Sequence, residues 1–305
     1  MLKNLLKRAK NAFLWDTLAE LNDIKQQLAE QKQMVTSLVQ LNQAVLQNQL
    51  KDAVAAKPDA KTLLSDLSVK VHSQFEEDGL LLLLFSIIGT TNKQCVEIGC
   101  SDGRECNTTN FILYHGWKGL LLDGDKGNVD RGNKFFGSHP NTNFNPPQFK
   151  QAWITKDNIN DLLTGFGFSG EIDLLSIDID GNDYHILNAI TAIQPRVVLC
   201  EVNGWIPPTV SNTIPYKEDF YCWDKPYPEV FFRSLSPAAA VKLMAQKGYR
   251  LVAAHREGFN LFFIKNELGG EQLPTITAEE VYNRVITDGG RKIWNDVKDM
   301  PWLNV

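Results

Sequence analysis

The amino-acid sequence predicts an α/β fold with a mostly parallel sheet, preceded by a long helical segment. Two apolar stretches support this prediction, because each reads as a short buried strand that ends in glycine or acidic residues: residues 95–103 and 119–125. Two further apolar runs, residues 249–253 and 260–264, flank a turn and predict a closing hairpin. Since open α/β sheets bind ligands at the carboxyl ends of their strands, we expect a site beside the first two stretches.

Composition narrows the class of protein. The net charge of -5 disfavours a nucleic-acid-binding surface over the whole protein. Five cysteines at irregular spacings provide neither a disulfide framework nor a C-x-x-C metal signature, and they fit a reducing compartment. Charges interrupt the amino terminus every few residues, so no secretory signal is predicted. We expect a cytoplasmic protein, either free or peripheral to the inner membrane.

The chain begins with a predicted basic amphipathic helix over residues 1–16, where leucines and aromatic residues alternate with lysine and arginine. Such a helix suits the surface of an anionic membrane, or it docks on its own protein. Residues 17–56 then predict a coiled coil that joins copies of the chain into a homo-oligomer. Its heptad positions are Leu21, Ile24, Leu28, Val35, Leu38 and Val45, with Gln31, Asn42 and Gln49 as polar interruptions. The alternative is a single amphipathic helix, and the number of strands stays open.

The globular part, residues 61–267, contains a glycine turn that predicts a cofactor site. Gly99 and Gly103 allow backbone to pass close to a ligand. Asp123 follows at about the spacing (~20 residues) at which such folds place an acid on the ribose hydroxyls. This pairing favours an adenosine-containing cofactor over an ordinary strand-turn-helix without a ligand. The dinucleotide and P-loop fingerprints are absent.

The turn itself resembles the first motif of S-adenosylmethionine-dependent methyltransferases, E-x-G-x-x-x-G, and Asp123 falls at their ribose-binding acid. The resemblance implies S-adenosylmethionine as cofactor. The cofactor-binding candidates in these two stretches are Glu97, Gly99, Cys100, Ser101, Asp102, Gly103, Asp123, Gly124 and Asp125.

Two other segments resemble one branch of these enzymes. Residues 73–79, S-Q-F-E-E-D-G, are similar to the S-Q-x-x-E-D-G entry of FkbM-type methyltransferases. That resemblance implies that Gln74, Glu77 and Asp78 lie near the cofactor, although helix capping explains the acids equally well. By the same resemblance, Trp153 and Ile154, after the third strand, lie along the adenine, with a core role for Trp153 as the alternative.

A second acidic cluster follows the apolar run at residues 172–177. It contains Asp178, Asp180, Asn182, Asp183 and His185. A solvated turn would explain these residues, but Asp178 ends a strand expected beside the glycine-turn strand, on the ligand side of the sheet. The pattern D-x-x-x-I-D-x-[DE]-G-N-[DE] also resembles FkbM-type enzymes.

A third strand end supplies Glu201 and Asn203. If its strand neighbours that of Asp178, the two acids meet above the sheet. Oxygen ligands from Asp178, Asp180, Glu201 and Asn203 would suit Mg²⁺ or Mn²⁺. Alternatively Asp178, Glu201 or His185 removes a proton from an acceptor hydroxyl as general base, although His185 is equally well explained as a structural residue.

Residues 205–235 form an aromatic insertion without regular periodicity, which we expect to cover the site as a lid or to hold an acceptor. Its aromatic faces suit stacking on sugar rings, with hydrophobic padding or a subunit contact as alternatives. Residues 268–305 predict a helical tail, with one helix near residues 278–287 and two tryptophans, Trp294 and Trp302.

The FkbM-type resemblance spans roughly residues 70–267. It implies a Rossmann-like class I methyltransferase fold and O-methyl transfer to a hydroxyl, often of a sugar. With the amphipathic start and the coiled coil, this suggests an acceptor in a cell-surface polysaccharide or related glycan. Nicotinamide redox chemistry is disfavoured by the missing third glycine, and nucleic-acid methylation by the charge. A non-catalytic coiled-coil scaffold of glycan assembly, with a degenerate cofactor site, is the remaining alternative.

Overall fold

The computed structural model describes residues 2–56 and 69–305, with side chains for residues 14–53 and 69–305. The chain divides into two compact units, Met1–Leu46 and Gln47–Val305. A single helix, α1 (Leu2–Ala56), forms the first unit and continues into the second. The two segments predicted over residues 1–16 and 17–56 therefore form one uninterrupted helix. Membrane contact by residues 1–16 and the coiled coil both stay predictions; the side chains of residues 2–13 lie outside the described part.

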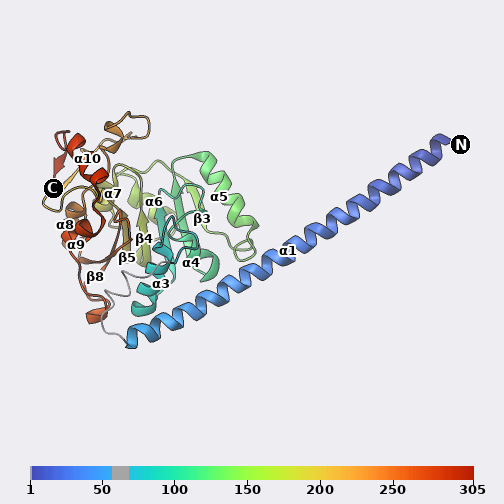
Figure 1. The fold of residues 1–305 in the computed structure, drawn as a ribbon, viewed down its shortest axis with the longest axis horizontal. Helices are drawn as coiled ribbons and strands as arrows, with labels where there is room; N and C mark the ends of the chain where they lie inside the picture. The colour runs from blue at the N-terminus through green and yellow to red at the C-terminus, as the bar shows by residue number, and fades with distance from the viewer. Residues whose placement is uncertain (1, 57–68) are drawn as a thin grey trace. The chain divides into compact units, whose positions relative to one another are not determined.

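A seven-stranded sheet forms the centre of the second unit (Figure 1), in the order β3-β2-β1-β4-β5-β8-β7. Its strands are β1 (Gln94–Ile98), β2 (Lys118–Asp123), β3 (Gln148–Gln151), β4 (Gly170–Ile177), β5 (Ile193–Glu201), β7 (Tyr249–Ala254) and β8 (Asn260–Lys265). The first five run parallel, and β8 is antiparallel to both β5 and β7. The predicted mostly parallel, Rossmann-like sheet with a closing hairpin is confirmed.

Helices cover the sheet, because its strands are apolar on both faces. On one face α6 (Ile159–Gly165), α7 (Asp183–Ala189) and α8 (Pro237–Gln246) pack against side chains such as Val96 and Leu175. The residues that alternate with these, such as Cys95 and Leu174, are also fully buried. The remaining helices of the sheet region are α3 (Glu77–Ile88), α4 (Thr109–Tyr114) and α5 (Lys126–Ser138). Burial on both faces is what a parallel sheet requires.

The insertion and the tail are joined by a small second sheet. Its strands are β6 (Asn212–Thr213) and β9 (Leu303–Asn304), which pair antiparallel. The insertion adds only one 3-10 turn, η1 (Glu229–Phe231), in agreement with its lack of periodicity. The tail contains η2 (Gly270–Gln272), α9 (Ala278–Val285) and α10 (Asp288–Val297) rather than one helix, because Ile286 is extended and Thr287 caps α10.

None of the helices within residues 2–56 and 69–305 is long and apolar enough to cross a membrane.

Candidate active site

The glycine turn after β1 lies directly against the end of β4. Gly99 has a φ of +80°, and a side chain at this position would place its Cβ 1.7 Å from the carbonyl oxygen of Asp178. Only glycine tolerates both the left-handed backbone and this approach. The turn therefore leaves an open space above the strand ends.

That space is a cleft of about 600 Å³ at the carboxyl ends of β1, β2 and β4. We call it the cofactor cleft. Seven of the predicted cofactor residues line it: Gly99, Ser101, Asp123, Gly124, Asp125, Trp153 and Asp178. The insertion closes another side of the cleft with Phe220, Tyr221 and Trp223. The insertion thus borders the site, and its role as a lid or acceptor segment stays a prediction.

Hydrogen bonds within the protein fix one carboxylate oxygen of Asp123. Its Oδ1 accepts hydrogen bonds from the backbone N–H of Asp125, at 2.8 Å, and from the side-chain amide of Asn128, at 3.1 Å. This fixes the carboxylate at the end of β2 and leaves Oδ2 for hydroxyl groups of a ligand. Asn128 also lines the cleft and was not predicted, since nothing in its spacing marks it.

Trp153 forms an apolar wall of the cofactor cleft. Its ring lies over Gly124, where a Cβ would come within 3.1 Å of the ring, and 52% of the side chain is exposed. The indole N–H donates to the carbonyl oxygen of Glu218 in the insertion, at 2.7 Å. The exposed ring is available to a planar base, so the alternative of a core role does not fit its position.

Glu97, by contrast, does not line the cleft. Its buried carboxylate accepts hydrogen bonds from the backbone N–H groups of Asn107 and Thr108 and from the Thr108 hydroxyl. Burial raises the pKa of Glu97, and these bonds oppose that shift. The residue therefore shapes the loop after the glycine turn instead of contacting a ligand.

Three more candidates of the turn also face away from the cleft. Cys100 is buried and its thiol lies 3.4 Å from the carbonyl oxygen of Leu122. Asp102 forms ion pairs with Arg104 and Arg131. Gly103 is needed for packing, because a Cβ there would meet the ring of Phe136 at 2.8 Å.

The acids of the entry segment fasten it to the rest of the fold, although the N-cap residue of α3, Glu76, makes no side-chain capping hydrogen bond. Asp78 Oδ2 accepts hydrogen bonds from the three successive backbone N–H groups of residues 71–73 and from the Ser73 hydroxyl. Desolvation raises the pKa of Asp78, and the same hydrogen bonds lower it. Asp78 lines no part of the cofactor cleft.

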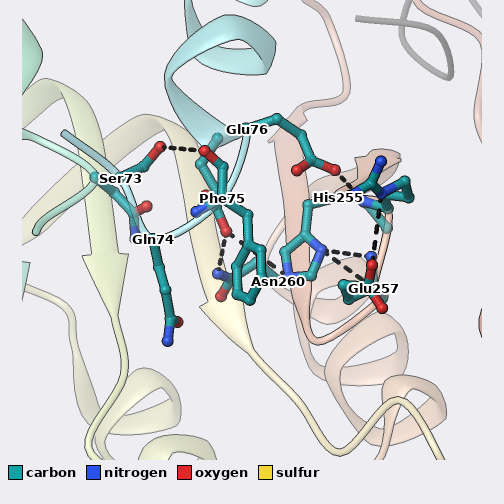
Figure 2. A network of polar contacts seen from close by, with 12 residues as sticks. Ser73, Gln74, Phe75, Glu76, His255, Glu257 and Asn260 are labelled. Carbon is teal, nitrogen blue, oxygen red and sulfur yellow. Dashed lines mark hydrogen bonds and ion pairs between the residues drawn. The ribbon is translucent and has the colours of Figure 1, made fainter. Parts of the chain in front are cut away.

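Glu76 and Glu77 connect the same segment to the β7–β8 hairpin, and Figure 2 shows the contact made by Glu76. Glu76 Oε1 accepts from the backbone N–H of Arg256 at 2.7 Å, and Glu77 Oε1 accepts from the Asn260 amide at 2.8 Å. The Gln74 side chain extends away from this network and lines a second cavity, not the cofactor cleft. The predicted contacts of Gln74, Glu77 and Asp78 with the cofactor are therefore not found. Glu77 and Asp78 hold the entry segment in place, and Gln74 lines the second cavity.

His255 in this network is neutral. Burial lowers the pKa of His255 to about 4. Its Nδ1 accepts from the backbone N–H groups of Glu257 and Gly258, so the ring proton sits on Nε2, which faces Glu77 Oε1 at 3.7 Å. The contact contributes packing and polarity rather than an ion pair.

The acids at the ends of β4 and β5 come together as predicted. Ile177 pairs with Cys200 in the parallel register, so Asp178 and Glu201 follow side by side. Carboxylate oxygens of Asp178, Asp180 and Glu201 all lie within 4.8 Å of one another. Burial and the neighbouring acids raise the pKa of Asp178 to about 7 and that of Glu201 well above its ordinary value. The raised pKa values of these two neighbouring carboxyl groups favour one proton on the pair near neutral pH.

Arg233, from the insertion, completes the cluster and was not predicted. Its guanidinium lies 3.2 Å from Asp180 Oδ1 and 4.5 Å above the ring of Trp223. The indole N–H of Trp223 donates to Asp180 Oδ2 at 3.0 Å. Asp180 thus has two partners from the insertion, an ion pair with Arg233 and a hydrogen bond from Trp223. No local signal marks Arg233 in the sequence, because its partner lies in a distant segment.

Asp183 and His185 of the acidic stretch are structural, whereas Asn182 lines the cofactor cleft. Asp183 is buried and accepts from the backbone N–H groups of Ile179 and Gly181. His185 lines neither cavity; its Nε2 lies 2.8 Å from the carbonyl oxygen of Ile214, and burial lowers its pKa. The catalytic role considered for His185 does not fit this position.

The comparison with protein families decides which proteins this architecture belongs with. The model of the methyltransferase FkbM domain matches residues 91–251, more than half of the chain. The chain belongs to the FkbM family of S-adenosylmethionine-dependent methyltransferases. The matched part of this FkbM methyltransferase contains β1 to β5, the insertion and all residues of the cofactor cleft. It leaves out the entry segment and the tail.

Solved structures resemble this FkbM methyltransferase at low identity. The crystal structure of monomeric WbdD has a TM-score of 0.35 and 14% identity, and the match covers 57% of this chain and 36% of WbdD. The O-methyltransferase from Bacillus cereus, in complex with SAH, has a TM-score of 0.39 and 14% identity, with 71% and 89% covered. The glycopeptide N-methyltransferase MtfA, complexed with S-adenosylmethionine, has a TM-score of 0.36 and 12% identity, with 58% and 83% covered. No curated protein sequence matches the chain.

Proposed function

We propose that this FkbM methyltransferase transfers a methyl group from S-adenosylmethionine to a hydroxyl group, with the carboxylate of Asp178 as general base. The observation that carries the proposal is the position of Asp178. It lines the cofactor cleft and also the second cavity, which contains Glu201 and Asn203. A base reached from both spaces can meet an acceptor oxygen that lies in line with a bound methyl donor.

The cofactor cleft offers groups that suit S-adenosylmethionine. Asp123 Oδ2 is placed to accept hydrogen bonds from ribose hydroxyls, and the exposed ring of Trp153 is placed to pack on adenine. Asp178 and Asp125, both on the wall of the cleft, favour the positive charge of the sulfonium and amino groups.

The proposed step is a direct displacement. The acceptor oxygen forms a bond to the methyl carbon while the carbon–sulfur bond breaks, and its electron pair returns to sulfur, which leaves S-adenosylhomocysteine. The hydroxyl proton passes to the Asp178 carboxylate, beside Glu201, whose raised pKa favours its protonated form. Positioning of the two reactants supplies much of the rate.

Arg233 bears on the choice between a metal and a metal-free base. The oxygens of Asp178, Asp180 and Glu201 suit Mg²⁺ or Mn²⁺ in type and spacing. However, Asp180 already has a guanidinium at 3.2 Å, and the Asn203 amide nitrogen donates to the carbonyl oxygen of Arg233. A divalent ion would have to displace or repel Arg233, so we propose the metal-free base.

For the acceptor, we propose a sugar hydroxyl in a cell-surface polysaccharide or related glycan, methylated in the cytoplasm or at the inner membrane. Carboxylates beside aromatic residues are the groups that recognise sugars, and the second cavity has both in Glu201 and Trp205. We further propose that α1 joins copies of the chain, because Leu21, Ile24 and Leu28 on its heptad positions are 44–64% exposed.

Titration calorimetry with S-adenosylhomocysteine, with NADH as control, tests the cofactor. We expect micromolar binding of the first and none of the second. Incubation with isotopically labelled S-adenosylmethionine and glycan acceptors, with and without EDTA, then tests the transfer. Absence of S-adenosylhomocysteine binding would overturn the proposal and favour the scaffold alternative.

A further inference from the structure

The second cavity has a volume of about 460 Å³ and adjoins the cofactor cleft. The two spaces share Asp178, Asp180 and Trp223. The second cavity therefore begins where the proposed base is and extends away from the cofactor. Its shape and charge decide which molecule reaches the base.

One wall of this cavity comes from the tail, which lies outside the matched family region. The tail residues that line it stand at the end of α9 and on α10: Val285, Ile286, Thr287, Gly290 and Ile293. Trp205 of the insertion also lines the cavity. At Gly290 a Cβ would lie 3.0 Å from the Cβ of Trp205, so α10 and the insertion touch there.

The tail wall is fastened in place. β9 pairs with β6, and Val305 and Ser211 exchange hydrogen bonds of 3.0 and 2.7 Å. The ring of Trp302 packs against Phe232 at a centroid distance of 4.6 Å. Because the end of the chain is anchored to the insertion, α10 forms a fixed boundary of the cavity.

The cavity is acidic and has no free cation to receive an anionic ligand. Asp178, Asp180, Glu201 and Glu257 line it. Among the described residues of the lining, Arg233 is the single cation, and its guanidinium is already paired with Asp180. An acceptor with a carboxylate or phosphate would meet more carboxylates than cations, whereas hydroxyl and ammonium groups would find acceptors.

We infer that this cavity binds the acceptor as an uncharged or amine-bearing hydroxylated ring, excludes anionic rings, and owes its size limit to α10. The inference rests on the proposed function, since it takes Asp178 as the base that the acceptor must reach. It assigns the choice of acceptor to a segment outside the family domain.

The charge is tested on protein saturated with S-adenosylhomocysteine, with methyl hexopyranosides, methyl 2-amino-2-deoxyhexopyranosides and methyl hexuronides of the gluco, galacto and manno series as probes. Saturation-transfer NMR measures their affinities. We expect the best neutral or amino ring to bind at least about tenfold more tightly than its hexuronide. Exposed Glu257 allows a reversal: Glu257→Lys raises hexuronide affinity severalfold and leaves S-adenosylhomocysteine affinity unchanged.

The wall is tested with Ile293→Trp, which fills the cavity, against Asn295→Trp, an exposed position on the same helix. We expect about tenfold weaker probe binding for the first and no change for the second, with equal S-adenosylhomocysteine affinity in both. Tighter hexuronide binding, no probe binding at about 100 mM, or equal probe affinities in the two variants would overturn the inference. Loss of S-adenosylhomocysteine binding by the unmodified protein would instead overturn the proposed function.

Discussion

A carboxylate oxygen of Asp178 lies within 4.8 Å of a carboxylate oxygen of Glu201, across the ends of two neighbouring parallel strands. Two ionised carboxylates this close repel each other and burial disfavours both charges, so the pKa of each group is raised. The pair therefore retains a proton near neutral pH, although both residues border open cavities. This links the strand register to the acid–base behaviour of the site.

The pH dependence of turnover follows from the raised pKa of Asp178, which is about 7. A base works only when deprotonated, so kcat/KM rises with pH through about 7 and then levels off. Asp178→Asn removes the base and lowers kcat by at least about a hundredfold, while S-adenosylhomocysteine still binds. Rates measured from pH 5 to pH 9 with labelled S-adenosylmethionine check both statements.

Asp180→Asn serves as the companion variant. The negative charge of Asp180 raises the pKa of Asp178, so its removal moves the acid limb of the profile to lower pH, by about one unit. If the acid limb does not move in Asp180→Asn, the pH profile reports the pKa of a group other than Asp178.

Asp123→Ala is expected to weaken the binding of S-adenosylhomocysteine by about 10- to 100-fold, the loss of hydrogen bonds to a charged group. The control is Asp130→Ala, which removes an exposed carboxylate of α5 that does not line the cleft. Calorimetry on both variants measures the difference. Unchanged affinity in Asp123→Ala would contradict the placement of the ribose.

Part of the site could be predicted from the sequence alone. Gly99, Asp123 and Asp178 were predictable because strand ends and turns are local patterns, and parallel strands bring such ends to one edge. The adjacency of Asp178 and Glu201 followed from the same rule, and the closing hairpin from two apolar runs that flank a turn.

Other roles depend on contacts between distant segments, which no spacing reveals. Glu97 was predicted to contact the cofactor, but its carboxylate accepts hydrogen bonds from the N–H groups of a loop that begins ten residues later. Arg233 meets Asp180 only because the insertion folds back over β4. The motif around Gln74 was recognisable. However, Glu76 and Glu77 of this motif hydrogen-bond to the hairpin, and the Gln74 side chain lines the second cavity.

Arg233 also predicts the response to metals. Since its guanidinium already neutralises Asp180, EDTA is expected to leave turnover unchanged. Arg233→Met keeps much of the side-chain bulk but removes the charge, which leaves three carboxylates within 4.8 Å of one another. We expect this variant to gain Mn²⁺ binding, detected as loss of the free Mn²⁺ signal in electron paramagnetic resonance.

The control for the gain of Mn²⁺ binding is Arg131→Met, which removes an exposed arginine outside both cavities. The unmodified protein provides the contradicting outcome. If EDTA abolishes its activity and Mn²⁺ restores it, the carboxylates hold a metal despite Arg233.

The heptad of α1 predicts an oligomer that charged substitutions dissociate. Ile24 and Leu28 are 60% and 64% exposed, and burial of two such side chains against a partner contributes about 1.5–3 kcal/mol each. Ile24→Asp combined with Leu28→Asp should therefore weaken association by more than about a hundredfold. Sedimentation equilibrium should then give the 34.4 kDa monomer for the variant and a multiple of it for the unmodified protein.

Gln26→Asp combined with Gln33→Asp provides the matched control, since it adds the same charge at exposed positions on the opposite side of the heptad. The control should remain oligomeric, and circular dichroism should show equal helix content in both variants. S-adenosylhomocysteine affinity should not change, because the cofactor cleft lies wholly within residues 99–223. A monomeric unmodified protein at micromolar concentration would refute the coiled coil and leave α1 as a single amphipathic helix.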